Sequence, residues 1–324
     1  MPADKRAARS MPRDLLIAIG AGGVSSLMTL SVVTGSPLSF FLVYLGSLPL
    51  YLAGLGFGFK AAGVAALVGA ATTAFSAGPL AGVLFAGVSG LPAFMVTVLA
   101  LRNRLGPDGQ TEWYAAGNIL ALLTALGAAF LALAALLTMG SDGGFEGAIR
   151  QYLSDLFAAM MPQLSELDRR DMTDVLAPAF PGAVLTSWLL MSAVNGGLAQ
   201  WVLARSGRAI RPSPTFADLD LPPWSALLLV GAGMMALFGP GSFEYVGRNL
   251  ALVLAAPFFF VGLAVVHALT RRVPFPGMFL AAFYVFVVLL SGFAALLLTG
   301  LGFLEQWACL RRRFAGPDKG QEDE

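Results

Sequence analysis

The sequence predicts an all-α polytopic membrane protein, a bundle of about eight to ten transmembrane helices with a cytoplasmic N-terminus. Of its 324 residues, 57% are hydrophobic and 12% are charged, whereas about 25% of residues are charged in an ordinary soluble domain. Long stretches contain no charge, and lysine and arginine gather in alternate loops between them. That loop pattern is typical of multi-pass membrane proteins.

Seven charge-free stretches define the candidate membrane segments: 15–59, 61–101, 113–141, 175–204, 221–243, 249–270 and 273–304. A helix rises about 1.5 Å per residue and the hydrocarbon layer is about 30 Å thick, so one crossing needs about 20 residues. The first two stretches are about twice that length. We expect Gly35-Ser36-Pro37 and Gly78-Pro79 to divide each of them into two helices.

Eight spans follow: 14–34, 38–58, 60–77, 79–101, 114–139, 181–204, 223–239 and 247–269. A straight helix over 275–308 would be about 51 Å long, which favours two short crossings over one. The expected break lies near Ser291-Gly292. The alternatives are nine spans with the basic tail outside, or a final helix lying at the interface.

Loop charges predict the orientation, because cytoplasmic loops carry an excess of lysine and arginine. A cytoplasmic N-terminal segment, 1–13, places most of these residues on the inner side: Lys5, Arg6, Arg9, Arg13, Lys60, Arg102, Arg104, Arg205, Arg208, Arg211, Arg271 and Arg272. The outer side receives only Arg150, Arg169, Arg170 and Arg248. The basic tail, Arg311–Arg313 and Lys319, is inside only if the number of membrane segments is even.

Residues 14–313 are expected to form a single integral membrane domain with two longer connections. The acidic extracytoplasmic loop 141–180 is predicted to contain an amphipathic helix and a second helix that begins at an N-cap, Ser165. It could be a lid over an outward-facing cavity or a connector packed on the surface. The cytoplasmic linker 205–222 contains prolines that favour extended chain, and the tail 314–324 is predicted to be disordered.

Composition argues against several function classes. A net charge of +1 provides no basic surface for nucleic acid. One cysteine, Cys309, and one histidine, His267, cannot build a zinc site of nitrogen and sulfur ligands. The spans lack the buried ionisable groups that proton-coupled carriers use, and Glu305 is expected at the interface. No catalytic motif is present in the sequence, so we expect no enzyme activity, no cofactor and no metal.

The best candidate ligand site is on the sixth span, where Trp188, Ser192 and Asn195 share one helix face. A neutral amide and a hydroxyl near an aromatic ring suit an uncharged or zwitterionic small molecule. Hydrogen bonds that merely hold helices together would use the same residue types.

Small residues recur at every fourth position of the third span: Ala62, Ala66, Ala70, Ala74 and Gly78. Such a face lets two helix backbones approach closely. It predicts either packing within the bundle or a docking face for another integral membrane subunit.

Short motifs in the C-terminal half resemble the YybS-like family of uncharacterised bacterial membrane proteins. They are Leu221-Pro222-Pro223-Trp224, Asn249 with Gly262-Leu263-Ala264-Val265, and Leu301-Gly302-Phe303-Leu304-Glu305-Gln306-Trp307 leading to Leu310-Arg311-Arg312-Arg313. The four-span block at the N-terminus is similar in layout, whereas the long acidic loop departs from the family. The resemblance implies a distant likeness to the substrate-binding subunits of energy-coupling-factor transporters, with a six-helix binding core.

Two hypotheses follow for a protein of the bacterial inner membrane whose surroundings are the lipid bilayer. In the first, the bundle binds a small solute or lipid as the passive subunit of an importer. In the second, the protein is a non-transporting scaffold or assembly factor for other membrane proteins.

Overall fold

A computed structural model describes residues 7–271 and 273–313, with side chains from Arg13 onward. Helices account for most of these residues, and the one β element among them is a two-stranded hairpin, β1 (Asn103–Leu105) and β2 (Thr111–Trp113). The predicted class, an all-α polytopic membrane protein, is confirmed. Residues 1–6 and the tail 314–324, including Lys319, lie outside the described residues, as does Arg272.

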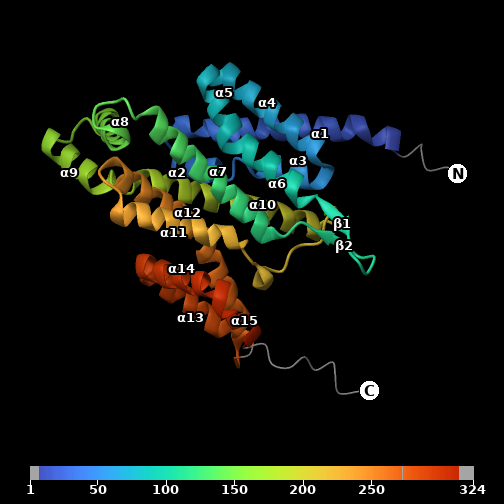
Figure 1. Cartoon of the computed structure of the whole chain (residues 1–324). Helices are drawn as coiled ribbons and strands as arrows, with labels where there is room; N and C mark the ends of the chain where they lie inside the picture. Colours follow the sequence, from blue (N-terminus) through green and yellow to red (C-terminus); the bar gives the residue numbers. More distant parts are fainter. Residues whose placement is uncertain (1–6, 272, 314–324) are drawn as a thin grey trace. The chain divides into compact units, whose positions relative to one another are not determined.

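The chain, whose elements are labelled in Figure 1, divides into two compact units. Unit 1 comprises residues 1–119 and 188–214, and unit 2 comprises residues 120–187 and 215–324. Two long helices, α7 (Ala116–Leu137) and α10 (Phe180–Arg205), contribute residues to both units.

Unit 1 contains the helices of the first four predicted spans. They are α1 (Ala7–Leu30) with a 3-10 turn to Thr34, α2 (Pro37–Tyr44), α3 (Leu48–Phe57), α4 (Phe59–Ala77), α5 (Pro79–Phe85), a π-helical turn (Ala86–Gly90) and α6 (Leu91–Ala100). Ser36 caps α2 through its side chain, with Pro37 in the first turn. Gly58 and Gly78 have φ of 95° and 94°, a region that favours glycine, so each reverses the chain between two spans.

Close backbone contact joins α1 to α4. A Cβ atom on Gly22 would overlap the carbonyl oxygen of Ala65, and the hydroxyls of Ser26 and Thr73 hydrogen-bond at 2.8 Å. Small residues therefore bring these helices together without bulky side chains between them.

Unit 2 is built around α12 (Ser242–Thr270), which packs against α11 (Pro223–Phe238) and α14 (Ser291–Ala308). Its other elements are α8 (Gly144–Met160), α9 (Glu166–Leu176), the turn Phe216–Asp218, α13 (Pro276–Leu289) and α15 (Leu310–Arg313). A Cβ on Gly302 would overlap the Phe258 carbonyl oxygen, and one on Gly262 would overlap that of Leu298. Glycines on both helices therefore set the closeness of α12 and α14.

Both helices expected in the acidic loop are present. Helix α8 buries Phe145, Leu153 and Phe157, and the Ser165 side chain accepts a hydrogen bond of 3.1 Å from the Asp168 amide at the start of α9. The periodic apolar residues and the N-cap signal were both sufficient to predict these elements.

The number of candidate spans is seven, or up to eight, among the described residues, fewer than the eight to ten predicted. All eight expected spans are helical, but α11 has only 16 residues because Pro222-Pro223 and Gly239-Pro240 bound it. The terminal segment breaks at Leu290, beside the expected site, and α13 and α14 meet there at 118°. A span count based on the length of apolar stretches assumes straight helices that cross the whole membrane. Helix α11 is too short for this assumption, and the pair α13 and α14 is bent.

Candidate functional site

The predicted polar face of α10 is buried in unit 1. Trp188, Ser192 and Asn195 are 7%, 2% and 1% exposed, respectively. Their positions on one helix face agree with the expected spacing, and the face is directed toward other helices of the same unit.

Two of the carbonyls that accept from this face, Val88 O and Tyr44 O, lack their usual helical partners. The Trp188 indole N–H donates to Val88 O at 2.7 Å; Pro92, four residues after Val88, has no N–H to offer. Asn195 Nδ2 donates to Tyr44 O at 2.6 Å and to Met191 O at 2.8 Å. The Leu48 amide, which would bond Tyr44 O in a continuous helix, bonds Leu45 O instead. These donors therefore repair breaks in neighbouring spans.

The remaining polar atoms of the face have no such partners. Ser192 Oγ and Asn195 Oδ1 are buried without a hydrogen bond to any described residue, as are Tyr51 OH, Ser47 Oγ and Thr97 Oγ1. We call these five residues the polar layer. The Ser192 and Tyr51 hydroxyls lie within hydrogen-bonding reach of each other, but they are not aligned to form a full hydrogen bond.

Three elements bring the polar layer together. Ser47 and Tyr51 stand one turn apart around the start of α3, and the Tyr51 ring would lie 3.6 Å from a Cβ on Gly196 of α10. Thr97 of α6 packs against Gly54, one turn beyond Tyr51. A hydroxyl or amide oxygen left unpaired in an apolar interior costs about 1–3 kcal/mol. The layer thus has unused capacity for hydrogen bonding.

Asn249 of α12 shows the contrasting arrangement in unit 2. Its Oδ1 accepts from the Gly182 amide at 2.8 Å, and its Nδ2 donates to Pro178 O at 3.1 Å and Tyr245 O at 2.9 Å. Both ends of this amide are satisfied by the fold, so Asn249 joins α12 to the start of α10. Asn195 differs because its oxygen remains free for another donor.

The small-residue face of α4 is in contact with helices of its own unit. Ala62 lies against Gly54, Ala66 against Gly90, and both Ala70 and Ala74 against Gly82, while Gly78 forms the turn to α5. These contacts account for the spacing of the row. A docking role for it stays a prediction.

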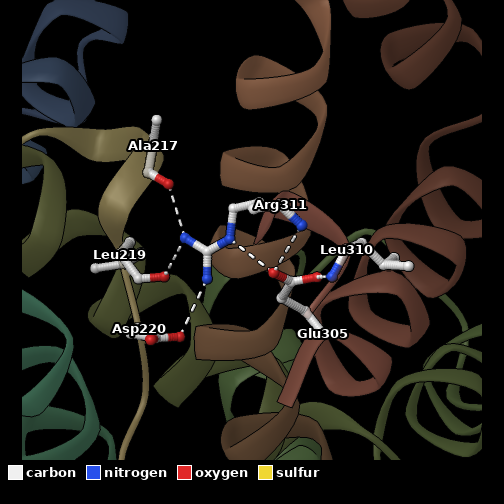
Figure 2. A network of polar contacts seen from close by, with 6 residues as sticks. All are labelled: Ala217, Leu219, Asp220, Glu305, Leu310 and Arg311. Atoms are coloured by element: carbon white, nitrogen blue, oxygen red, sulfur yellow. Dashed lines mark hydrogen bonds and ion pairs between the residues drawn. The ribbon is translucent and has the colours of Figure 1, made fainter. Parts of the chain in front are cut away.

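A second polar region lies where α14 ends in unit 2 (Figure 2). Glu305 is only 5% exposed, and it accepts hydrogen bonds from the Leu310 amide at 2.7 Å and from Arg311 Nε at 2.9 Å. Arg311 also donates to Ala217 O and Leu219 O and pairs with Asp220 at 3.1 Å. The sequence pattern predicts Glu305 at the interface and does not reveal its burial, because its partners, Leu310 and Arg311, lie beyond the end of the helix.

This network borders an open pocket of about 760 Å³. Linker, α12 and α14 residues surround it: Ala217, Asp218, Asp220, Leu221, Pro223, Ala268, Leu269, Arg271, Glu305, Gln306, Cys309, Arg311 and Arg312. Parts of two sequence motifs noted above, at 221–224 and 301–313, therefore meet at one place.

A family model described as "Predicted membrane protein (DUF2232)" matches residues 23–305. The chain belongs to this family. No curated protein and no solved structure matched the chain.

The DUF2232 match includes the whole polar layer and ends at Glu305, before Arg311. Of the layer, the sequence pattern identified Ser192 and Asn195 but not Ser47, Tyr51 or Thr97. Tyr44, Ser47 and Tyr51 recur at helical spacing within one apolar span, which was the available signal.

Arg211 secures the linker of this DUF2232 protein to unit 1. It is 7% exposed, donates to Ala100 O at 3.1 Å and Tyr114 O at 3.3 Å, and lies over the Trp113 ring. Gln200 Nε2 in turn donates to Arg211 O at 2.9 Å. Burial of its guanidinium lowers the pKa of Arg211, because desolvation disfavours the charged form.

Proposed function

We propose that this DUF2232 family member binds a small uncharged or zwitterionic solute at the polar layer of unit 1. The observation that carries the proposal is the set of five buried polar atoms without hydrogen-bond partners among the described residues. Their unpaired state is unfavourable, and a solute with hydroxyl, amide or ammonium groups relieves it.

The chemistry of the layer selects the ligand class. Four hydroxyls can donate or accept, and Asn195 Oδ1 can only accept. The layer contains no carboxylate, lysine or arginine to bind a strongly charged solute. These groups hold a ligand by hydrogen bonds and do not supply a general base at neutral pH, which supports binding without catalysis.

The transport role extends this proposal. The solute-binding protein would act as a passive importer subunit in a bacterial inner membrane, with its N-terminus cytoplasmic, as the loop charges favour. The resemblance to YybS-like proteins, and through them to energy-coupling-factor subunits, supports this as an analogy of fold. A second integral subunit would be the required partner, whereas the scaffold alternative needs no solute.

Native mass spectrometry of the protein extracted with its own lipids tests solute binding. The wild-type protein should retain a bound small molecule, and Ser192→Ala should release most of it. Ser25→Ala is the matched control, because the Ser25 hydroxyl already bonds Gly46 O in the same unit. Equal retention by Ser192→Ala and wild type, or no bound species in either, would contradict the proposal.

A further inference from the structure

The pocket at the end of α14 contains both satisfied and unsatisfied polar groups. Arg311 neutralises Glu305 and contacts Asp220, so these three charges are bound to one another. Among the described residues, no carboxylate lies within ion-pair distance of Arg271 or Arg312, which also line the pocket. The lining as a whole has three arginines and three carboxylates. Arg311 pairs with two of these carboxylates, so Arg271 and Arg312 are the arginines that remain available to an anionic ligand.

An unpaired amide adds a further donor to these two arginines. Gln306 Nε2 is buried and has no hydrogen-bond partner among the described residues, and Gln306 lines the same pocket. Two guanidinium groups and an amide N–H form a donor set that suits phosphate oxygens.

The surroundings favour a lipid as the source of the phosphate. On α14, Leu304 is 58% exposed and Trp307 is 62% exposed, directly beside Glu305 and Gln306. Exposed tryptophan at a helix end is typical of the level of the headgroups. Loop charges favour a cytoplasmic position for this end of the helix, and the cytoplasmic leaflet carries anionic lipids.

We propose that this pocket binds the phosphate of an anionic phospholipid, with Arg271, Arg312 and Gln306 as donors. Arg311 positions the wall of the pocket by fastening the linker carbonyls of Ala217 and Leu219 to Glu305 (Figure 2). The acyl chains lie along the apolar surface of α14. This site is in unit 2 and does not depend on the solute site of unit 1.

The experiment measures binding of phosphatidylglycerol to the full-length protein in phosphatidylcholine nanodiscs. We expect about fivefold weaker binding for each arginine removed, so Arg271→Gln/Arg312→Gln should bind about 25-fold more weakly. Gln306→Leu should bind about tenfold more weakly at unchanged charge. Arg271→Lys/Arg312→Lys should keep most of the affinity, which separates loss of charge from misfolding.

The charge-matched control is Arg205→Gln/Arg208→Gln, which removes two cations from the predicted cytoplasmic side outside this pocket. Equal weakening by both glutamine pairs would show general surface attraction and overturn the proposal. Inorganic phosphate that binds as tightly as the lipid would overturn the lipid assignment. Affinity that does not depend on headgroup charge would overturn the site altogether.

Discussion

At the scale of single residues, side chains in this protein repair backbone groups that the helices leave unpaired. Trp188 and Asn195 supply donors to Val88 O and Tyr44 O. Arg211 and Arg311 each donate to two carbonyls, of Ala100 and Tyr114 and of Ala217 and Leu219, respectively. An apolar environment offers few alternative partners, so such contacts determine where irregular backbone is tolerated.

Ser192→Ala and Asn195→Leu should have opposite effects on stability. The first removes a buried hydroxyl without a partner, so the ligand-free protein should keep its stability or gain up to about 1 kcal/mol. The second removes donors to Tyr44 O and Met191 O and should cost about 1–2 kcal/mol. Thermal unfolding in detergent compares the two, and an equal loss for both would contradict the assigned roles.

Arg311→Met should be among the most damaging changes at a polar residue. It leaves the Glu305 carboxylate buried without its ion-pair partner, and such an uncompensated charge costs about 3–5 kcal/mol. Arg312→Met removes an exposed neighbour and should cost less than about 0.5 kcal/mol. Denaturant unfolding of both variants provides the comparison.

At the scale of elements, glycines and proline-bounded turns decide how the helices meet. Gly22 allows α4 to pack closely against α1, and Gly262 and Gly302 allow α12 and α14 to pack closely against each other. In unit 2, α8 and α9 are joined by Arg150, which pairs with Glu146 at 3.0 Å and also with Asp174.

Two glycines on α14 provide a sharp test of the contact between α12 and α14. Gly302→Ala forces a methyl group into the Phe258 carbonyl and should cost about 3 kcal/mol or more. A methyl group on Gly300 meets nothing within 4 Å, so Gly300→Ala should stabilise the helix by up to about 1 kcal/mol. Thermal melts followed by circular dichroism should show a lower melting temperature for Gly302→Ala than for Gly300→Ala. The reverse order would contradict the close packing of α12 and α14.

The ion pairs of Arg150 should contribute little to the free energy of unfolding, and this contribution should not change across the neutral pH range. The pKa of Arg150 is raised chiefly by the hydrogen bond to Asp174 and, to a smaller extent, by the hydrogen bond to Glu146. A base with a raised pKa contributes its full stability below its unfolded-state pKa, and this is lost only as pH rises through the folded pKa. Both pKa values of this guanidinium lie well above the pH of either measurement. Arg150→Gln should therefore cost about 0.5 kcal/mol alike at pH 6 and pH 9, measured by thermal unfolding.

At the scale of the whole molecule, the orientation of the helices decides on which side of the membrane each proposed site would open. Seven helices are long enough to cross, α11 is shorter, and α13 and α14 are bent by 118°. If the bent pair enters and leaves on one side after eight crossings, Arg311–Arg313 remain cytoplasmic, in agreement with the loop charges.

The single cysteine allows a direct measurement of that topology. Cys309 is partly exposed beside the pocket at the end of α14. A membrane-impermeant maleimide should label it in permeabilised cells and not in intact ones, with Cys309→Ser as the unlabelled control. Labelling in intact cells would place the C-terminus outside.

Composition, charge and periodicity were enough to predict a helical membrane protein, the positions of its apolar helices, and the residues of α10 that share a face. Periodicity and charge suffice for these features because they depend on neighbours within one helix. Only the tertiary structure brought Tyr44, Ser47 and Tyr51 to Asn195 and Ser192, and Arg311 to the linker. Pairing of helices is decided by the fit of small residues and by hydrogen bonds, since lipid and protein interior are alike apolar and hydrophobic pattern cannot distinguish one neighbour from another.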